Sequence, residues 1–270
     1  ILFEAIEFFQ LRSFWYFLTG TIWSPGVANS QFGALPIFAG TFVITIIALL
    51  VAIPIGLGSA IYMSEYASPK FRDYLKPILE ILAGIPTVVY GFFAAITVAP
   101  LVVKVAAFFG LEATFNSALA SGIVMGIMII PLISSLSDDV IRAVPDSQRK
   151  AAFALGMTHG ETIKNIVIPS AMPGIISASL LALSRALGET MIVVMAAGLR
   201  PNLSWNPLED MTTVTVTIVN SLVGDFEFNS PETLSAFALG LVLFIVTLIL
   251  NMISLSLIRK FKEKYKVNTL

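Results

Sequence analysis

Two charged residues, Arg185 and Glu189, stand within an otherwise apolar stretch of the sequence and are the residues best placed to do chemistry. Positions four apart lie on the same face of an α-helix, so a continuous helix would bring the two side chains together. A charge at the centre of a bilayer costs about 2.5–3.5 kcal/mol on insertion scales, so it normally faces protein or a water-filled path. Because a guanidinium presents a planar fork of donors, the pair predicts a path for a tetrahedral oxyanion. A buried ion pair that only fixes helix packing is the alternative.

The carboxylate makes the expected site selective for the protonation state of the anion. Glu189 would hold Arg185 in position or accept a hydrogen bond from a protonated anion such as hydrogen phosphate, and it would repel a dianion that brings no proton. Ser184 and Thr190 border the same segment, so the expected substrate path comprises Arg185, Glu189, Ser184 and Thr190. We predict no metal site, because the sequence has no Cys and only one His, and no catalytic residue, because no Ser/His or paired-Asp arrangement appears within the apolar stretches.

The elements that must position these residues are membrane helices. Of the 270 residues, 57% are hydrophobic and 12% are charged, against about 45–50% and about 25% in soluble domains. A crossing helix needs roughly 20 apolar residues. The windows of the sequence that provide them are residues 37–63, 81–103, 113–137, 173–197 and 233–258. Since apolar and polar residues do not alternate, we predict an all-α, polytopic membrane helical bundle rather than a β-barrel.

The distribution of Lys and Arg predicts the orientation of this bundle. Most of these residues follow the first, third and fifth windows, so residues 138–170 and a basic tail, residues 259–270, should be cytoplasmic. The aromatic-rich residues 1–36 should rest at the outer headgroup level, and the acidic loop 199–232 should also lie outside. The transmembrane domain would comprise residues 37–258. Because the first residue would then be outside, we expect a sixth, N-terminal span before it.

A short motif in the expected cytoplasmic loop indicates a protein partner. Small residues around Ala152 favour a helix, and Gly156 would end it. Thr158 or His159 would cap a second helix, which Pro169 would end at the entry to the membrane. Two short helices joined by a Gly turn form a compact knob, which suits insertion into the groove of a partner.

The same motif resembles the EAA loop of permease subunits of ATP-binding-cassette importers, in which Glu-Ala-Ala is followed by a Gly and by Ile-x-Leu-Pro. The matching positions are Ala151, Ala152, Gly156, Ile166 and Pro169, whereas Lys150 replaces the Glu and Ile168 replaces the Leu. The resemblance implies the MetI-like fold of type I importer permeases and docking of this loop on a separate ATPase subunit. An interfacial hairpin without a partner is the alternative.

The sequence carries no phosphate loop of its own, because no Gly is followed by Lys. We therefore expect this chain to bind no cofactor and to have no ATPase activity. ATP and Mg²⁺ would be used by the partner ATPase subunit.

Three further phrases resemble the transmembrane subunits of phosphate-specific (Pst-type) importers. They are SRALGETM at residues 184–191, VMAAG at 194–198 and GIPTVVYG at 84–91. Gly-Glu-Thr-Met rather than Gly-Glu-Thr-Ala favours the C-type subunit over the A-type. The resemblance implies that Arg185 and Glu189 take part in phosphate passage. It also implies the partners, which are a second homologous permease subunit in a heterodimer, two ATP-binding subunits, a phosphate-binding protein on the outer face and membrane lipid.

Together these patterns predict a permease subunit that moves phosphate across a prokaryotic cytoplasmic membrane by alternating access. One alternative is a permease for another oxyanion, such as sulfate, molybdate or tungstate. An alternative of another class is a secondary transporter or channel that needs no ATPase, which would explain the spans and the charges within them but not the EAA-like loop. The net charge of −1 predicts no nucleic-acid partner.

Overall fold

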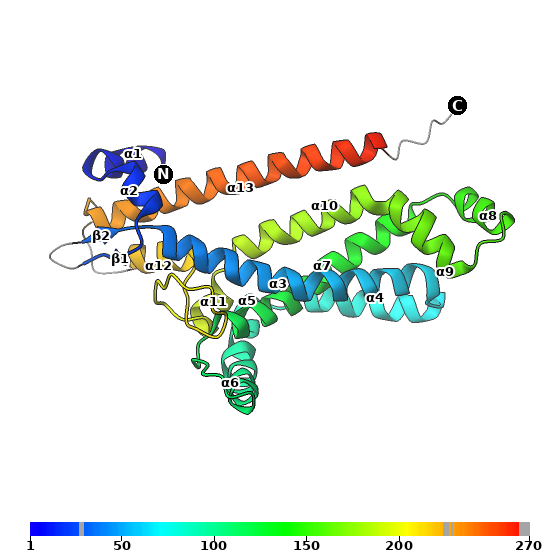
Figure 1. Cartoon of the computed structure of the whole chain (residues 1–270), viewed down its shortest axis with the longest axis horizontal. Helices are drawn as coiled ribbons and strands as arrows, with labels where there is room; N and C mark the ends of the chain where they lie inside the picture. Colours follow the sequence, from blue (N-terminus) through cyan, green and yellow to red (C-terminus); the bar gives the residue numbers. More distant parts are fainter. Residues whose placement is uncertain (27–29, 224–226, 228, 265–270) are drawn as a thin grey trace. The chain divides into compact units, whose positions relative to one another are not determined.

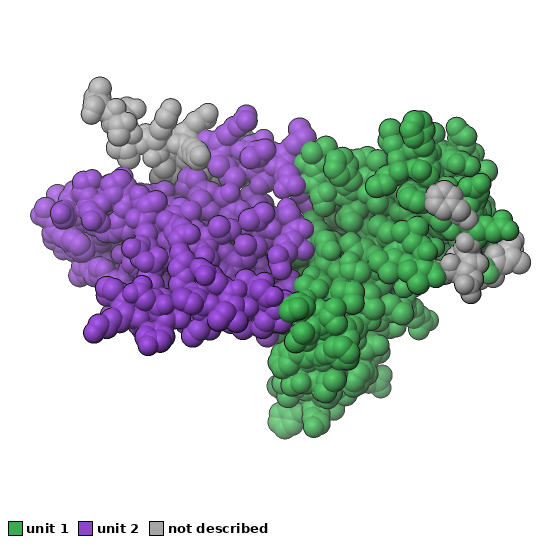
Figure 2. Space-filling model, turned by 180° about the vertical axis from the view of Figure 1, so that it is seen from behind, with its two compact units in different colours: residues 1–48, 86–125, 186–248 green, residues 49–85, 126–185, 249–270 purple. Residues whose placement is uncertain are grey.

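The computed structural model describes residues 1–26, 30–223, 227 and 229–264, without the side chains of residues 257 and 260–264. The chain divides into two compact units, which Figure 2 colours separately. Unit 1 comprises Ile1–Ala48, Pro86–Met125 and Ala186–Leu248, and unit 2 comprises Leu49–Ile85, Gly126–Arg185 and Ile249–Leu270. Four helices contribute residues to both units, and they are α3 (Leu35–Ile61), α7 (Ala118–Arg142), α10 (Ile168–Leu187) and α13 (Pro231–Lys264) (Figure 1).

Unit 1 holds short helices and one small hairpin besides its parts of the long helices. The hairpin pairs its two strands antiparallel, with Trp23 opposite Phe32. In chain order the elements are α1 (Leu2–Leu11), α2 (Phe14–Thr19), β1 (Trp23–Ser24), β2 (Gln31–Phe32), α5 (Thr87–Phe93), the π-helical turn η2 (Ala94–Val98), α6 (Ala99–Phe108), α11 (Met191–Ala196) and α12 (Val214–Val223).

The first residues of unit 1 pack around an aromatic core. Phe8, Phe17, Trp23 and Phe32 are buried, and the rings of Phe8 and Phe32 meet edge to face with their centroids 5.5 Å apart. This geometry is favoured because the positive edge of one ring faces the negative face of the other. Part of the aromatic content therefore serves the core, whereas the sequence predicted contact with lipid headgroups for this segment. Residues 27–29 of the predicted outer segment lie outside the described residues.

Unit 2 is built from helices in its described part. Its apolar core joins the ends of α3 and α7, through Ala60 and Ile141, to the end of η3 (Ile163–Val167) and the first half of α10, through Val167 and Ile175. The further elements of unit 2 are η1 (Tyr62–Tyr66), α4 (Pro69–Gly84), α8 (Asp146–Ala154), α9 (His159–Thr162), η3 and α10 up to Arg185.

Among the described residues, five helices are long and apolar enough to cross a membrane, as predicted. Their bounds are Leu35–Tyr66, Thr87–Phe108, Ala118–Arg142, His159–Leu187 and Pro231–Ser256. The side of the membrane on which each connection lies stays a prediction. Residues 224–226 and 228 of the predicted outer loop and residues 265–270 of the predicted tail lie outside the described residues.

The predicted second span, residues 81–103, is wrong at its beginning. Helix α4 continues to Gly84, and a new helix starts at Thr87 with Pro86 as its N-cap. The reason is local, because a proline lacks the N–H that a continuing helix needs and forces the residue before it into an extended conformation. Ile85 accordingly has φ −64° and ψ 130°.

Two prolines lie inside long helices directly after a π-helical turn. Pro100 follows η2 (Ala94–Val98), and Pro169 follows η3 (Ile163–Val167). A proline ring clashes with the carbonyl four residues earlier, and a π turn shifts the hydrogen bonding by one residue at that place. The predicted end of a helix at Pro169 is therefore wrong, since the helix runs on as α10 to Leu187.

Candidate functional site

The helix that carries Arg185 breaks before it reaches Glu189. Helix α10 ends at Leu187, Gly188 forms a turn, and α11 begins at Met191. The predicted continuous span over residues 173–197 is therefore wrong, and so is the placement of Arg185 and Glu189 on one helix face. Gly188 weakens the helix because glycine has about the lowest helix propensity apart from proline.

Glu189 uses its carboxylate to stabilise the beginning of α11. The side chain is 8% exposed, and its Oε1 accepts hydrogen bonds from the N–H groups of Met191 at 3.0 Å and Ile192 at 3.4 Å. The first N–H groups of a helix have no partner within the helix, so a carboxylate there supplies the missing acceptor and favours the helix dipole. This competing use of Glu189 is a physical reason for the break.

A threonine-rich segment, residues 211–217, supports the same break. Thr215 donates from Oγ1 to the carbonyl oxygen of Glu189 at 2.8 Å, so the non-helical backbone there finds a partner. Thr212, Thr213 and Thr217 are buried in the same unit, and Thr212 Oγ1 has no hydrogen-bond partner among the described residues. The sequence interpretation missed these residues, although three threonines in alternation with valines in an apolar region were a visible signal.

Arg185 and Ser184 lie at the end of α10, in unit 2. The Arg185 side chain is exposed, and no hydrogen bond or ion pair within the described part of that unit involves it. Ser184 Oγ lies 3.1 Å from the carbonyl oxygen of Leu180 and 3.2 Å from Oδ1 of Asn251 on α13. Thr190 is the N-cap residue of α11, in unit 1, but its side chain makes no capping bond.

The EAA-like motif folds into the predicted pair of short helices, which we call the α8–α9 knob (residues 146–167). Ala151 and Ala152 lie on α8, with Ala152 buried and Ala151 exposed. Gly156 has φ +82°, in the left-handed region that glycine adopts without strain. The N–H of Met157 donates to the carbonyl oxygen of Ala152 at 3.2 Å, the six-residue closure of a Schellman motif.

The second helix of the knob begins as predicted at Thr158. Its Oγ1 accepts from the N–H of Glu161 at 3.3 Å, while Oε2 of Glu161 accepts from the N–H of Thr158 at 2.8 Å, which forms a capping box. Ile166 lies in η3 and Pro169 is the second residue of α10, so these motif positions belong to the following span.

Comparison with known proteins decides the family. Residues 52–266 match the family model of the binding-protein-dependent transport system inner membrane component. The chain belongs to this family. As a binding-protein-dependent inner membrane component, it is a multi-pass membrane protein, and the knob lies within the matched region.

Relatives in this family extend the match over most of the chain. The probable ABC transporter permease protein YqgH of Bacillus subtilis is 35% identical over 251 residues, covering 93% of this chain and 78% of that protein. The phosphate transport system permease protein PstC 1 of Mycobacterium tuberculosis is 32% identical over 288 residues, covering 95% and 85%. The resemblance to C-type subunits of phosphate-specific importers is thereby confirmed.

A solved structure confirms the fold class of this inner membrane component. The MetNI methionine ABC transporter in an inward-facing conformation aligns with a TM-score of 0.61, covering 84% of this chain and 94% of that chain. At 16% identity this similarity shows the fold alone, which is the MetI-like helical bundle of type I importer permeases.

Proposed function

We propose that this chain is a permease subunit of an ATP-driven importer that moves inorganic phosphate across a prokaryotic cytoplasmic membrane. The observation that carries the proposal is the similarity to a phosphate transport permease over 95% of the chain. Another oxyanion permease or an ATPase-independent transporter has no comparable support.

Phosphate passage would use the polar side chains that flank Gly188 in the sequence. Oε1 of Glu189 is engaged by two N–H groups, whereas no hydrogen bond between described residues reaches Oε2. Oε2 is therefore the atom that would accept a hydrogen bond from the hydroxyl group of hydrogen phosphate, a donor that sulfate lacks near neutral pH. The exposed guanidinium of Arg185 would supply transient electrostatic stabilisation for the anion, with no covalent step. Ser184 and Thr190 would border this path.

The energy would come from two separate ATPase subunits, which hydrolyse ATP with Mg²⁺ and engage the α8–α9 knob. Apolar side chains at the tip of the knob support this docking, because Leu155 is 81% exposed and Phe153 is 45% exposed. Exposed large apolar side chains beside polar ones are typical of a protein interface. A second, homologous permease subunit would complete the membrane channel.

A phosphate-binding protein would dock on the outer loops, and the ordered loop 199–213 offers a surface for it. Trp205 is 73% exposed, and tryptophan is enriched among the residues that dominate binding energy at interfaces. Glu209 organises the loop by accepting from Nδ2 of Asn202 at 2.9 Å and from Nδ2 of Asn206 at 3.0 Å. The backbone is also held, since the N–H of Ala118 donates to the carbonyl oxygen of Glu209 at 3.0 Å.

The test is ATP-driven uptake by proteoliposomes that contain this chain with the ATPase, second permease and binding protein that co-purify with it. We expect uptake of phosphate and none of sulfate or molybdate. Arg185→Gln should abolish uptake, whereas Arg259→Gln, which removes an exposed charge beyond the last span, should leave it intact. Uptake without ATP would contradict the ATP-driven mechanism, and preferential uptake of another oxyanion would contradict phosphate as the substrate. Full uptake by Arg185→Gln would contradict the role of Arg185.

A further inference from the structure

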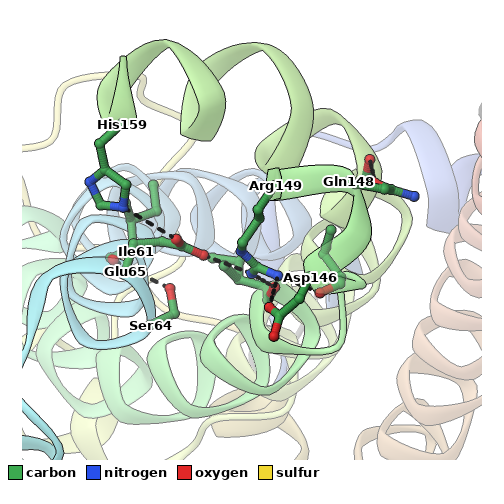
Figure 3. Close-up of polar contacts among 10 residues, drawn as sticks. Ile61, Ser64, Glu65, Asp146, Gln148, Arg149 and His159 are labelled. Atoms are coloured by element: carbon green, nitrogen blue, oxygen red, sulfur yellow. Dashed lines mark hydrogen bonds and ion pairs between the residues drawn. The ribbon is translucent and has the colours of Figure 1, made fainter. Parts of the chain in front are cut away.

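Arg149, on α8 of the knob, joins α8 to two other segments of unit 2 (Figure 3). Its Nη2 donates to Oε1 of Glu65 at 2.9 Å and to the carbonyl oxygen of Ile141 at 3.0 Å. Its Nη1 donates to the carbonyl oxygen of Val144 and, at 3.4 Å, to Oδ1 of Asp146. One side chain therefore joins α8 to η1, which continues α3, and to the end of α7.

The contact with Glu65 is a shielded ion pair. The Arg149 side chain is 16% exposed and the Glu65 side chain is 6% exposed. Charges removed from water are stable only when they are paired and hydrogen-bonded, and losing one partner leaves the other uncompensated. The pair is therefore held in one geometry more firmly than a solvent-exposed pair would be.

The same carboxylate also faces the second helix of the knob. Oε2 of Glu65 lies 3.8 Å from Nε2 of His159, and the ring of His159 meets the ring of Tyr66 edge to face at 5.0 Å. Figure 3 shows His159 and Arg149 reaching Glu65 from two helices of the knob. Glu65 is thus the position at which both helices of the knob meet the extension of α3.

The contacts with Ile141 and Val144 stabilise the end of α7. Helix α7 ends at Arg142, and the last carbonyl groups of a helix have no partner within it. A basic side chain that binds such carbonyls caps the helix and favours its dipole. Arg149 therefore holds the ends of two membrane spans to one short helix.

We propose that Arg149 is a positioning residue that transmits displacement of α8 to α3, through Glu65, and to α7, through the carbonyl groups of Ile141 and of Val144 directly after the helix. The inference rests on the proposed function, since an ATPase subunit must move the knob. A guanidinium suits this role because its planar fork holds several acceptors at fixed angles, which a lysine cannot do. Without the contact, the knob would move with the ATPase while the two spans would not follow.

The experiment uses the assembled transporter in nanodiscs and follows α3 directly. Because the chain has no cysteine, Ile55→Cys on α3, at a position that is 53% exposed, carries an environment-sensitive fluorophore at a single site of this subunit. The ATP-induced fluorescence change and ATP hydrolysis are measured in the same sample. The variants are Arg149→Gln, Glu65→Gln and the double variant. Lys164→Gln is the matched control, since Lys164 is an exposed basic residue of the knob that makes no hydrogen bond or ion pair with another described residue.

We expect the Arg149→Gln complex to retain its ATPase subunits and ATP hydrolysis. The amplitude of its ATP-induced fluorescence change should be about tenfold smaller, which is within the range of coupling between linked sites. Glu65→Gln should behave alike, and the double variant should be no worse than either single variant, because one link is broken in all three. Lys164→Gln should respond as the unmodified complex does.

Each of three results would overturn the inference. They are a full-sized fluorescence change in Arg149→Gln, additive losses in the double variant, and loss of the ATPase subunits from Arg149→Gln alone. If Arg149→Gln does not fold, Arg149→Lys decides, since it keeps the charge beside Glu65 but not the fork, and a full response from it would also refute the role. An unmodified complex that responds to ATP but takes up no phosphate would contradict the proposed function and leave this inference standing.

Discussion

The turn at Gly156 allows a sharp test of how the knob is built, because a second glycine of the same segment serves as its control. A Cβ added at Gly156 or at Gly160 would meet no atom within 4 Å, so neither position lacks space. The two differ in the backbone, since Gly156 has φ +82° and Gly160 has no such left-handed conformation. The substitution Gly156→Ala therefore isolates the cost of backbone conformation from the cost of packing.

The expected cost follows from that conformation. A non-glycine L-residue in the left-handed region is destabilised by about 1–2 kcal/mol, because its Cβ approaches its own backbone. This amount changes a conformational equilibrium by a factor of about 5–30. Gly156→Asn should be less destabilising than Gly156→Ala, since asparagine visits the left-handed region more readily. Gly160→Ala should be neutral or slightly stabilising because alanine favours a helix.

The measurement is amide hydrogen exchange of peptides that cover residues 146–167, with the protein in nanodiscs. We expect opening of this segment to become about 5–30-fold more frequent in Gly156→Ala and to be unchanged or slower in Gly160→Ala. Binding of the ATPase subunit should weaken in the same order. Equal exchange in the two alanine variants would refute the assignment of the left-handed conformation as the feature that shapes the knob.

Three further predictions concern single side chains. Glu189→Ala should lower the free energy of unfolding by about 1–3 kcal/mol, because two N–H groups of α11 lose their acceptor. Glu189→Gln keeps an acceptor, so it should lower the free energy of unfolding less. Thermal unfolding in detergent measures both variants. Arg72→Gln should cost about 3–5 kcal/mol because it leaves Asp138, which is 1% exposed, without its partner at 2.7 Å. The matched variant Lys76→Gln breaks a 3.0 Å pair with a 55% exposed carboxylate and should cost about 0–1 kcal/mol, and urea unfolding distinguishes the two. Hydrogen bonds from Ser204, Asn202 and Asn206 hold the pKa of Glu209 below its usual 4.5. Loop 199–213 should therefore stay ordered above pH 4.5 and lose its order as the pH falls through the lowered pKa of Glu209. Hydrogen exchange of the loop checks this, with Glu209→Gln as the control that does not titrate.

Local patterns in the sequence predicted the parts of the fold that depend on near neighbours. The number of membrane helices follows from runs of apolar residues, and the Gly156 turn with its Thr158 cap follows from residue types within one or two helical turns. The π turns before Pro100 and Pro169 did not follow, although the prolines were visible. A proline can end a helix or be absorbed by a π turn, and packing of the flanking helices decides between these outcomes.

The sequence by itself determined the class of protein, the number of spans and the motif that marks the knob, because hydropathy and short-range helix signals are properties of adjacent residues. Only the tertiary structure decided what the charged groups do. The helix that was expected to pair Glu189 with Arg185 breaks, and Glu189 caps α11 while its carbonyl oxygen binds Thr215, 26 residues later. Arg149 finds its carboxylate 84 residues away, in Glu65. A buried charge takes whichever partners the fold brings within reach, since the cost of leaving it unpaired exceeds any local preference.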